Sequence, residues 1–317
     1  MERESDSDLP GRPGLAALGD ASTVELLAGA AGSAVGAERL AARESLYSIR
    51  DPEVDIVYIA TPPGSHLDYA LESIKAGKPV YIEKPMARTW EECKIINDAA
   101  DKAGLPVFVA YYRRSLDYFK KVKSIIKSGS LGKILHINMQ QYYAARPEDY
   151  DPKNLPWRVI PEDAGGGYFH DLGCHAIDIL FHIFGDPLEV SGKATNIGGL
   201  YAAEDTLSAT LVLPGEIMVT GSWNFVTPEP FTKDLVEVIG EKGKLKFSIF
   251  SFKPMILSSG LHQEVKATIQ PEHIQMPHIQ SIVSELNGTD HCPATGESSA
   301  VTSRVMDIIT GKIKSYI

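Results

Sequence analysis

The chain has 317 residues, a formal net charge of −10 and 44% hydrophobic residues, which favours an ordinary globular protein of two domains. The acidic balance argues against nucleic acid or an anionic membrane as a main partner, and no apolar run approaches the ~20 residues of a membrane span. Three cysteines without a CxxC pair argue against a disulfide framework or a cysteine zinc site, so with the polar, acidic start we expect a cytoplasmic protein.

Residues 1–43 differ sharply in composition from the rest of the chain. They contain no Ile, Lys or aromatic residue, and Ala and Gly fill 16 of the 43 positions. Ser22 could cap a short helix with Glu25 at its third position, and the stretch lacks the β-branched and aromatic run that a buried strand prefers. We therefore set residues 1–43 apart as a separate segment and expect much of it to be poorly ordered or loosely packed.

After this segment the chain alternates regularly between two patterns. Short apolar runs that end at Pro or Gly alternate with amphipathic stretches of helical period. The pattern predicts strands and helices in turn, over residues 55–60, 66–76, 80–82, 89–104 and 107–110. This order predicts a doubly wound parallel sheet, so the fold class is α/β.

From about residue 131 the pattern changes to strands without helices between them, interrupted by one strong helix over residues 169–184. The change predicts a second, α+β domain built on an antiparallel sheet. Its expected strands cover residues 133–141, 206–213, 216–224, 235–239 and 244–250.

Three motifs then occur in order along the chain. Residues 51–85 contain a strand, Thr-Pro, a helix, Ala-Gly-Lys, a second strand and Glu-Lys-Pro. Residues 165–178 contain a triple glycine followed by a D-x-x-x-H-x-x-D pattern, and residues 278–309 contain a helix, a loop and a helix. Together these motifs resemble the Gfo/Idh/MocA family, which includes glucose–fructose oxidoreductase and inositol dehydrogenase. The resemblance covers roughly residues 45–317.

The resemblance implies an oxidoreductase that moves a hydride between NAD or NADP and a CH–OH group of a sugar or polyol. Residues 44–114 would be the remainder of a Rossmann-type dinucleotide-binding domain that is atypical or incomplete at its start. Residues 115–317 would be an α+β domain for substrate binding and oligomerisation. Family members commonly assemble through the open face of the second sheet, which implies a homodimer or a homotetramer.

Lys84 lies two residues beyond the predicted strand at 80–82 and directly before Pro85. A lysine at the carboxyl end of a parallel strand faces the ligand crevice, where its ammonium can hydrogen-bond a substrate oxygen and relay a proton. A crowded site could lower the pKa of this ammonium. The alternative is a solvated surface lysine before a turn, and the resemblance implies the catalytic role.

Asp171, His175 and Asp178 share one face of the predicted helix, because they lie four and three residues apart. An imidazole titrates near neutral pH, which suits exchange of the alcohol proton that accompanies hydride transfer. The resemblance implies that His175 is the acid/base group and that Asp171 positions the substrate and the lysine, while Asp178 could hold the imidazole. Alternatively, Asp171 caps the helix and His175 is a satisfied, half-buried histidine.

Further candidates lie near the strand ends and before the triple glycine. The resemblance implies cofactor contacts from Thr61, Pro62, His66, Glu83, Lys84, Trp157 and Arg158. Substrate contacts are expected from Tyr112, Arg113, Arg158, Asp171 and His175, with Arg158 a candidate ligand for an anion or a hydroxyl. The alternatives are an ordinary Pro-rich loop after residue 60 and a surface ion pair for Arg158.

The chain departs from the family in its phosphate-binding glycine loop. The early glycines fall at positions 11, 14 and 19 and at 29, 32 and 36, and neither group has G-x-G-x-x-G spacing or follows an expected strand. Such glycines let the backbone approach a pyrophosphate. A second hypothesis is therefore a non-catalytic remnant that binds no dinucleotide.

A third hypothesis, a metal-dependent hydrolase, rests on several acidic and imidazole side chains at helical spacing: His170, Asp171, His175, Asp178 and His182. We assign no metal site, because His182 lies a full turn beyond Asp178 and the family pattern already accounts for the other residues.

Overall fold

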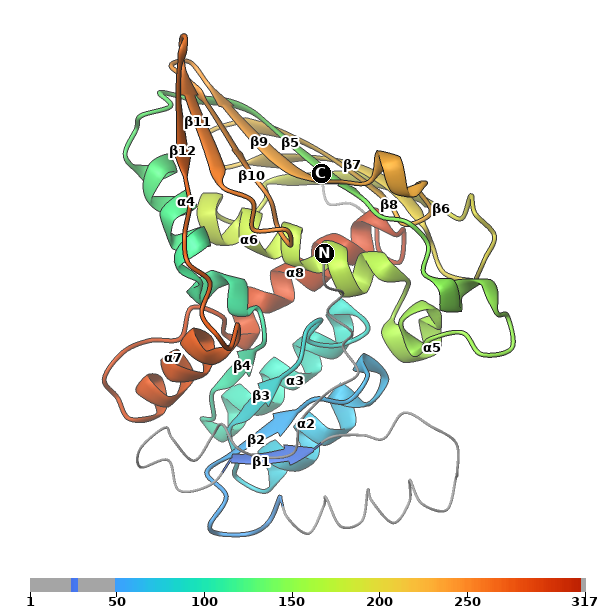
Figure 1. Cartoon of the computed structure of the whole chain (residues 1–317). Coiled ribbons are helices and arrows are strands. Elements are labelled where there is room, and N and C mark those ends of the chain that lie inside the picture. Colours follow the sequence, from blue (N-terminus) through green and yellow to red (C-terminus); the bar gives the residue numbers. More distant parts are fainter. Residues whose placement is uncertain (1–23, 28–48, 315–317) are drawn as a thin grey trace.

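The structure is a computed structural model that describes residues 24–27 and 49–314 (Figure 1). These residues form a four-stranded parallel sheet and an eight-stranded sheet, with helices between and around them. The predicted α/β class is confirmed. No helix in these two ranges is long and apolar enough to span a membrane.

The smaller sheet contains β1 (Val24–Leu27), β2 (Ile56–Ile59), β3 (Val80–Ile82) and β4 (Val107–Val109). They lie in that order, and every neighbouring pair is parallel. The last three strands are almost entirely buried, and they consist of β-branched and aromatic residues. The strands expected from the short apolar runs are confirmed.

Two helices connect these strands as predicted, α2 (His66–Lys75) and α3 (Trp90–Ala103). The Thr89 hydroxyl accepts a hydrogen bond from the Glu92 backbone N–H at 3.2 Å and so caps the start of α3. Gly104 ends the helix at a φ of 65°, where a glycine carries no steric cost. These connections bring the carboxyl ends of β2, β3 and β4 to one edge of the sheet, which is where open α/β sheets bind ligands.

Val24–Leu27 is a strand, so the short helix expected to start at Ser22 is wrong for these residues. β1 pairs with β2 over its whole length, and the backbone hydrogen bonds offered by β2 outweigh a weak capping signal. β1 also ends two residues before Gly29, so the expectation that no strand precedes the second glycine group is wrong. The other positions of residues 1–43 lie outside the described residues, and so does the expected disorder.

The larger sheet contains β5 (Ile134–Tyr142), β6 (Glu189–Thr195), β7 (Thr206–Leu213), β8 (Ile217–Asn224), β9 (Lys233–Gly240), β10 (Lys244–Phe247), β11 (Met255–Ser259) and β12 (His262–Lys266). Its order is β12-β11-β10-β9-β5-β8-β7-β6. Neighbours are antiparallel except β5 and β8, which run parallel. The sheet is therefore mixed, because β8 reaches β5 only after a long excursion through helices and the β6–β7 pair.

Helices cover one face of the larger sheet and separate it from the smaller sheet (Figure 1). The longer ones are α4 (Asp117–Lys127), α6 (Cys174–Phe184) and α8 (Gly296–Ile309). A further helix, α7 (Met276–Leu286), packs against the parallel sheet, where Ile282 clusters with Tyr81 and Phe108. Short turns are η1 (Pro63–Ser65), η2 (Tyr112–Ser115), η3 (Pro147–Tyr150), η4 (Trp157–Val159), α5 (Pro161–Ala164) and η6 (Glu229–Phe231).

The last helix, α8, packs against the first domain. The Trp90 backbone N–H at the start of α3 donates to Asp307 Oδ2 at 2.7 Å. Gly296, the first residue of α8, lies so close to β4 that an added Cβ would sit 2.8 Å from Val107 Cγ1. The C-terminal end of the chain therefore completes the core around the parallel sheet.

The helix predicted over residues 169–184 is confirmed, but it begins with a π-helical turn, η5 (Phe169–Gly173), ahead of α6. A π-turn carries one residue more than an α-turn and often marks a functional site. A side chain at Gly173 would collide with the Phe169 ring, because an added Cβ would lie 2.5 Å from it. The turn therefore needs the glycine, and it carries Asp171.

Candidate active site

Lys84 and Asp171 form a buried ion pair where the two domains meet. Lys84 follows β3, and Asp171 lies in the π-turn before α6. Lys84 Nζ donates to Asp171 Oδ1 at 2.6 Å and to its backbone carbonyl oxygen at 3.0 Å. The two side chains are only 17% and 9% exposed, so the alternative of a solvated surface lysine is wrong.

Each residue of this pair shifts the pKa of the other so that both stay charged. Burial alone would lower the pKa of the Lys84 ammonium, but the Asp171 carboxylate outweighs burial and raises that pKa above its ordinary value. Burial also opposes ionisation of Asp171, yet Lys84 and Arg158 hold the pKa of its carboxyl below the ordinary range. The expectation of a lowered pKa for Lys84 is therefore wrong. The upward shift favours the charged form of Lys84, in which the ammonium is a hydrogen-bond donor.

Arg158 brings a second cation to the same carboxylate. It lies in η4, and its Nε contacts Asp171 Oδ2 at 3.2 Å. Its guanidinium carbon lies 4.6 Å from the centre of the Trp157 ring. This contact orients the planar guanidinium group. The structure thus places the predicted Trp-Arg pair beside Lys84 and Asp171, where Arg158 contacts a site carboxylate.

His175 lies in α6, is 3% exposed and has an Nδ1 without a hydrogen-bond partner among the described residues. Three aromatic rings stand edge-on or nearly so to it at 6.1, 5.7 and 5.6 Å, those of Tyr111, Tyr112 and Phe250. Burial, followed by the charges of Arg113 and Lys84, holds the pKa of the imidazole well below its ordinary value. His175 is therefore neutral at neutral pH and able to accept a proton.

Asp178 does not hold this imidazole. Arg114 Nη2 donates to Asp178 Oδ1 at 2.6 Å, and Arg114 Nε donates to Oδ2 at 3.0 Å. A carboxylate that is 1% exposed takes a charged partner, and Arg114, on η2, supplies it. The expectation that Asp178 supports His175 is wrong.

The buried side chain of His66 holds the loop after β2 in place. The His66 ring is fully buried, with Nε2 2.7 Å from the Thr61 carbonyl oxygen and Nδ1 3.2 Å from that of Met86. Burial lowers the pKa of this imidazole below its ordinary value. Both ring nitrogens face backbone carbonyls, so neither is free for a ligand, and the cofactor contact expected of His66 stays a prediction. His66 joins the loop that carries Thr61 and Pro62 to the segment after Lys84.

Glu83, a further cofactor candidate, is fixed within the carboxyl edge of the parallel sheet. Its Oε1 accepts hydrogen bonds from the Tyr58 hydroxyl at 2.6 Å and from the Gln275 side-chain amide at 3.3 Å. Its Oε2 accepts one from the Lys84 backbone N–H at 3.1 Å. These contacts hold the turn that presents the Lys84 ammonium.

Arg113 lies beside His175, as expected for a residue of the site. Its Nε donates to the Ile249 carbonyl oxygen at 3.1 Å. Its guanidinium carbon lies 4.3 Å from the centre of the Phe250 ring and 4.8 Å from that of Tyr112. The same two rings border His175, so Tyr112 and Arg113 line the space next to the imidazole.

Two family models match the chain in succession. One, an oxidoreductase family with an NAD-binding Rossmann fold, covers residues 25–111, and the other, the GFO/IDH/MocA C-terminal domain, covers residues 119–246. An oxidoreductase of Formosa agariphila is 32% identical over 263 residues, which are 83% of this chain and 80% of that protein. The chain belongs to the Gfo/Idh/MocA family.

Other Gfo/Idh/MocA-related proteins match over different extents. The scyllo-inositol 2-dehydrogenase (NADP(+)) of Bacillus subtilis is 37% identical over 143 residues, which are 45% of this chain and 38% of that protein. The structure of an aldose-aldose oxidoreductase from Caulobacter crescentus, complexed with glycerol, shares the fold with a TM-score of 0.73. It is 23% identical, and the match covers 84% of this chain and 79% of that one.

The cofactor of this Gfo/Idh/MocA protein is NAD or NADP, in keeping with its NAD-binding Rossmann family. The described residues fit the reactive end of such a cofactor. Lys84 and the Thr61–Pro62 loop lie at the carboxyl edge of the parallel sheet, and His175 keeps a buried nitrogen without a partner. The family match begins at residue 25, within the segment set apart by composition, and the domain boundaries at 43 and 114 stay predictions.

The metal-hydrolase hypothesis is wrong, because its residues do not converge on one point and all of them except His175 contact separate partners. His170 Nδ1 lies 3.0 Å from Glu204 Oε1, and His182 Nε2 lies 3.1 Å from the ammonium of Lys123. The two aspartates of that set bind the lysine and arginines described above. In the described part of the chain, no three His, Cys, Asp or Glu side chains converge as metal ligands.

Sequence reasoning missed three residues of the site. Phe250 follows β10 in a loop without a motif, and Arg146 acts from a distance as a further charge that lowers the pKa of Asp171. Arg114 stands next to Arg113, and that doublet was the one local signal for a second buried arginine. None of the three carries a pattern that separates it from an ordinary aromatic or basic residue.

Proposed function

We propose that this protein is an NAD(P)-dependent dehydrogenase or reductase acting on a CH–OH group of a sugar or polyol. The observation that carries the proposal is the charged Lys84–Asp171 pair beside a neutral His175 with an unpartnered nitrogen. Oxidation of an alcohol needs an acceptor for the hydroxyl proton and a positive charge near the oxygen. Two of the relatives reported above are named for an inositol and an aldose.

In the oxidation direction, His175 accepts the hydroxyl proton of the substrate while the Lys84 ammonium donates a hydrogen bond to the same oxygen. Asp171 keeps Lys84 charged and in position, and Arg158 holds the other oxygen of Asp171. The nicotinamide ring, when bound, supplies the hydride acceptor. In reduction the imidazolium of His175 returns its proton to the oxygen as the carbonyl becomes an alcohol.

The residues that would hold the two ligands follow from their places in the fold. We expect Thr61, Pro62, Glu83, Lys84, Trp157 and Arg158 to lie along the cofactor. His66 would act mainly by holding the loop. We expect Tyr112, Arg113, Arg158, Asp171 and His175 to contact the substrate. The protein would work in the cytoplasm.

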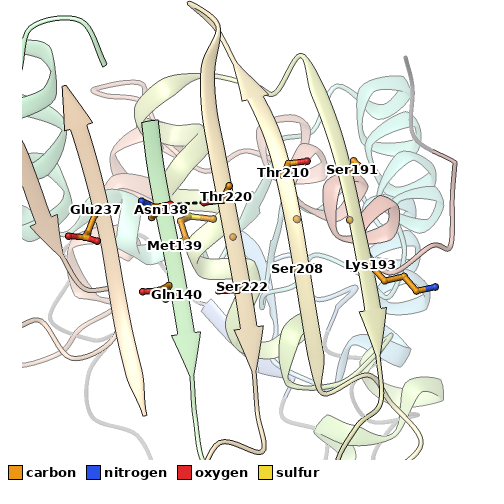
Figure 2. A pocket seen from close by; sticks show the side chains of 13 residues that line it. Asn138, Met139, Gln140, Ser191, Lys193, Ser208, Thr210, Thr220, Ser222 and Glu237 are labelled. Carbon is orange, nitrogen blue, oxygen red and sulfur yellow. Dashed lines mark hydrogen bonds between the residues drawn. The ribbon is translucent and has the colours of Figure 1, made fainter. Parts of the chain in front are cut away.

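For the assembly we propose a homodimer or homotetramer formed through the open face of the larger sheet. Figure 2 shows that face, where Gln140, Ser208, Thr210 and Ser222 stand on neighbouring strands around a hollow of about 720 Å³. Short side chains on a wide sheet let a second copy approach closely. Light scattering on the purified protein measures the state, and a monomer at micromolar concentration would contradict the proposal.

The first experiment is a fluorescence titration of the purified protein with NADH and NADPH, followed by a turnover screen on sugars and polyols. We expect micromolar binding of one cofactor. The Lys84→Ala variant should lose turnover by roughly 10²–10⁴-fold and keep measurable cofactor binding. Absence of binding at millimolar cofactor would overturn the proposal in favour of the non-catalytic remnant, whose glycine spacing departs from the fingerprint.

A further inference from the structure

Arg113 is a buried cation without an acidic partner in the described part of the chain. It is 3% exposed, its Nε is used by a backbone carbonyl, and its buried Nη1 has no hydrogen-bond partner there. A guanidinium stays charged at any pH that a folded protein meets, so it cannot relieve burial by losing its proton. An unpaired buried charge is costly and needs an anion.

The nearby carboxylates are already committed to other groups. Asp178 binds Arg114 with both oxygens, and Asp171 binds Lys84 and Arg158. Asp234 accepts three backbone N–H groups at 2.8–2.9 Å, from Ile249, Phe250 and Ser251. None of these carboxylates hydrogen-bonds Arg113, so an anion bound from outside would be its first such partner.

The guanidinium of Arg113 and the imidazole of His175 share their aromatic neighbours. The Phe250 and Tyr112 rings each contact both Arg113 and His175, which places the guanidinium next to the proposed proton acceptor. Arg113 is also the largest charge acting on the imidazole. Lys84 and Arg158 share the carboxylate of Asp171, whereas Arg113 forms no ion pair in the described part of the chain. This balance favours a substrate that brings a negative charge of its own.

We propose that the substrate is a sugar acid, whose carboxylate binds Arg113 while one of its CH–OH groups faces His175 and Lys84. A planar carboxylate matches the guanidinium fork, and a charge-assisted pair of this kind is among the strongest polar contacts in proteins. The inference rests on the proposed function, because that function places the reacting carbon beside His175. It narrows the substrate from sugars and polyols in general to their carboxylate derivatives.

The test compares acids with neutral sugars of the same size. Calorimetry on the whole protein, with and without NADH, would measure D-glucuronate against D-glucose, D-galacturonate against D-galactose, and D-gluconate against D-sorbitol. We expect the acid to bind at least tenfold more tightly in one pair or more. If every neutral partner binds as tightly as its acid, or no acid binds, the proposal is wrong. The NADH titration reports on the proposed oxidoreductase function separately.

Variants at position 113 assign the effect to the guanidinium. Arg113→Gln should bring the affinities of acid and neutral sugar within about threefold of each other, and Arg113→Lys should restore part of the preference because it keeps the charge. Equal weakening of both sugars would show that Arg113 only supports the aromatic wall. A matching loss of NADH affinity in Arg113→Gln would assign the anion to a cofactor phosphate and overturn the proposal. The acid preference of the unmodified protein decides the matter if a variant does not fold.

Discussion

His175 owes its proton-accepting state to its surroundings. A histidine in water is half protonated near pH 6.5, whereas this ring is sealed among aromatic side chains and faces two cations. Both effects act against a positive charge on the imidazole. The group that takes the proton in the proposed reaction is therefore ready at neutral pH, and Lys84, charged by its partner, is not a competitor for it.

Replacing His175 with Gln should separate its chemistry from its packing. The change keeps a polar side chain of similar size but removes the titrating nitrogen, so we expect kcat to fall by roughly 10²–10⁴-fold. In the unmodified protein, oxidation should keep its rate from pH 7.5 down to pH 6, because the imidazole stays neutral well below 6.5. Steady-state kinetics across pH measure both effects. The exposed His262→Gln variant is the control, and unchanged kcat in His175→Gln would assign the proton to another group.

At the residue scale, the sequence predicted the site residues that lie within a motif. It did not predict the contacts between residues that are far apart along the chain. Lys84, Asp171 and His175 stand in recognisable patterns, and the structure brings all three together. The partner of Asp178 could not be predicted, because Arg114 lies 64 residues away and no local pattern joins them. For the same reason the enclosure that His175 shares with Phe250 was not foreseen.

At the scale of elements, the π-turn η5 is the part that positions the carboxylate of Asp171. His170, within this turn, lies between Glu204 Oε1 and the Lys312 ammonium, each 3.0 Å from a ring nitrogen. Gly166 leaves the room for that ring, because an added Cβ would overlap the imidazole of His170. The triple glycine before the turn is thus a packing requirement of the element that carries Asp171.

Gly166→Ala should therefore damage catalysis through the turn. The added methyl displaces His170 and with it the backbone of Asp171, so we expect kcat to fall by at least about tenfold, as for other small misplacements of reacting groups. NADH affinity, which depends mainly on the parallel sheet, should stay within about threefold. Kinetics and cofactor titration on the same preparation measure the split. Full activity would mean that the turn tolerates the shift and that Asp171 is positioned by Lys84 and Arg158 alone.

Helices and strands with a clear hydrophobic pattern could be predicted from the sequence. Elements that form only because another strand or segment packs beside them could not. The apolar runs of β2, β3 and β4 identified the parallel sheet. β1 has no such run and exists because β2 offers it a partner. The parallel pairing of β5 with β8 and the extra residue of the π-turn also follow from tertiary contacts, which residue spacing does not record.

At the scale of the whole molecule, several buried histidines make stability depend on pH. Burial lowers the pKa of His66 and His175, and it brings the pKa of His182 to about 3 and that of His278 to about 4. Below about pH 6.5 these histidines become protonated in the unfolded chain but stay neutral in the folded protein. The free energy of unfolding therefore falls as pH falls. Each such group contributes up to about 1.4 kcal/mol per pH unit until its folded-state pKa is reached.

His278→Gln should reduce this acid sensitivity. The residue is fully buried, with Nε2 2.9 Å from the Val109 carbonyl oxygen, and its titration window runs from about 6.5 down to about 4. Between pH 7 and pH 5 the variant should lose roughly 1–2 kcal/mol less unfolding free energy than the unmodified protein. Urea denaturation at both pH values measures this difference. His262→Gln, at an exposed position, should lose as much as the unmodified protein; equal losses in all three proteins would contradict the assignment.

The packing of α8 against α3 and β4 has a consequence for how the chain is made. A ribosome releases the parallel sheet well before the helix that packs against it, because α8 (Gly296–Ile309) follows all of the strands described above along the chain. Until then β4 lacks the neighbour that lies against Val107, and the start of α3 lacks the Asp307 carboxylate. During translation β4 and the start of α3 therefore lack this neighbour until α8 has been made, which makes the nascent chain a natural client for a chaperone at the tunnel exit.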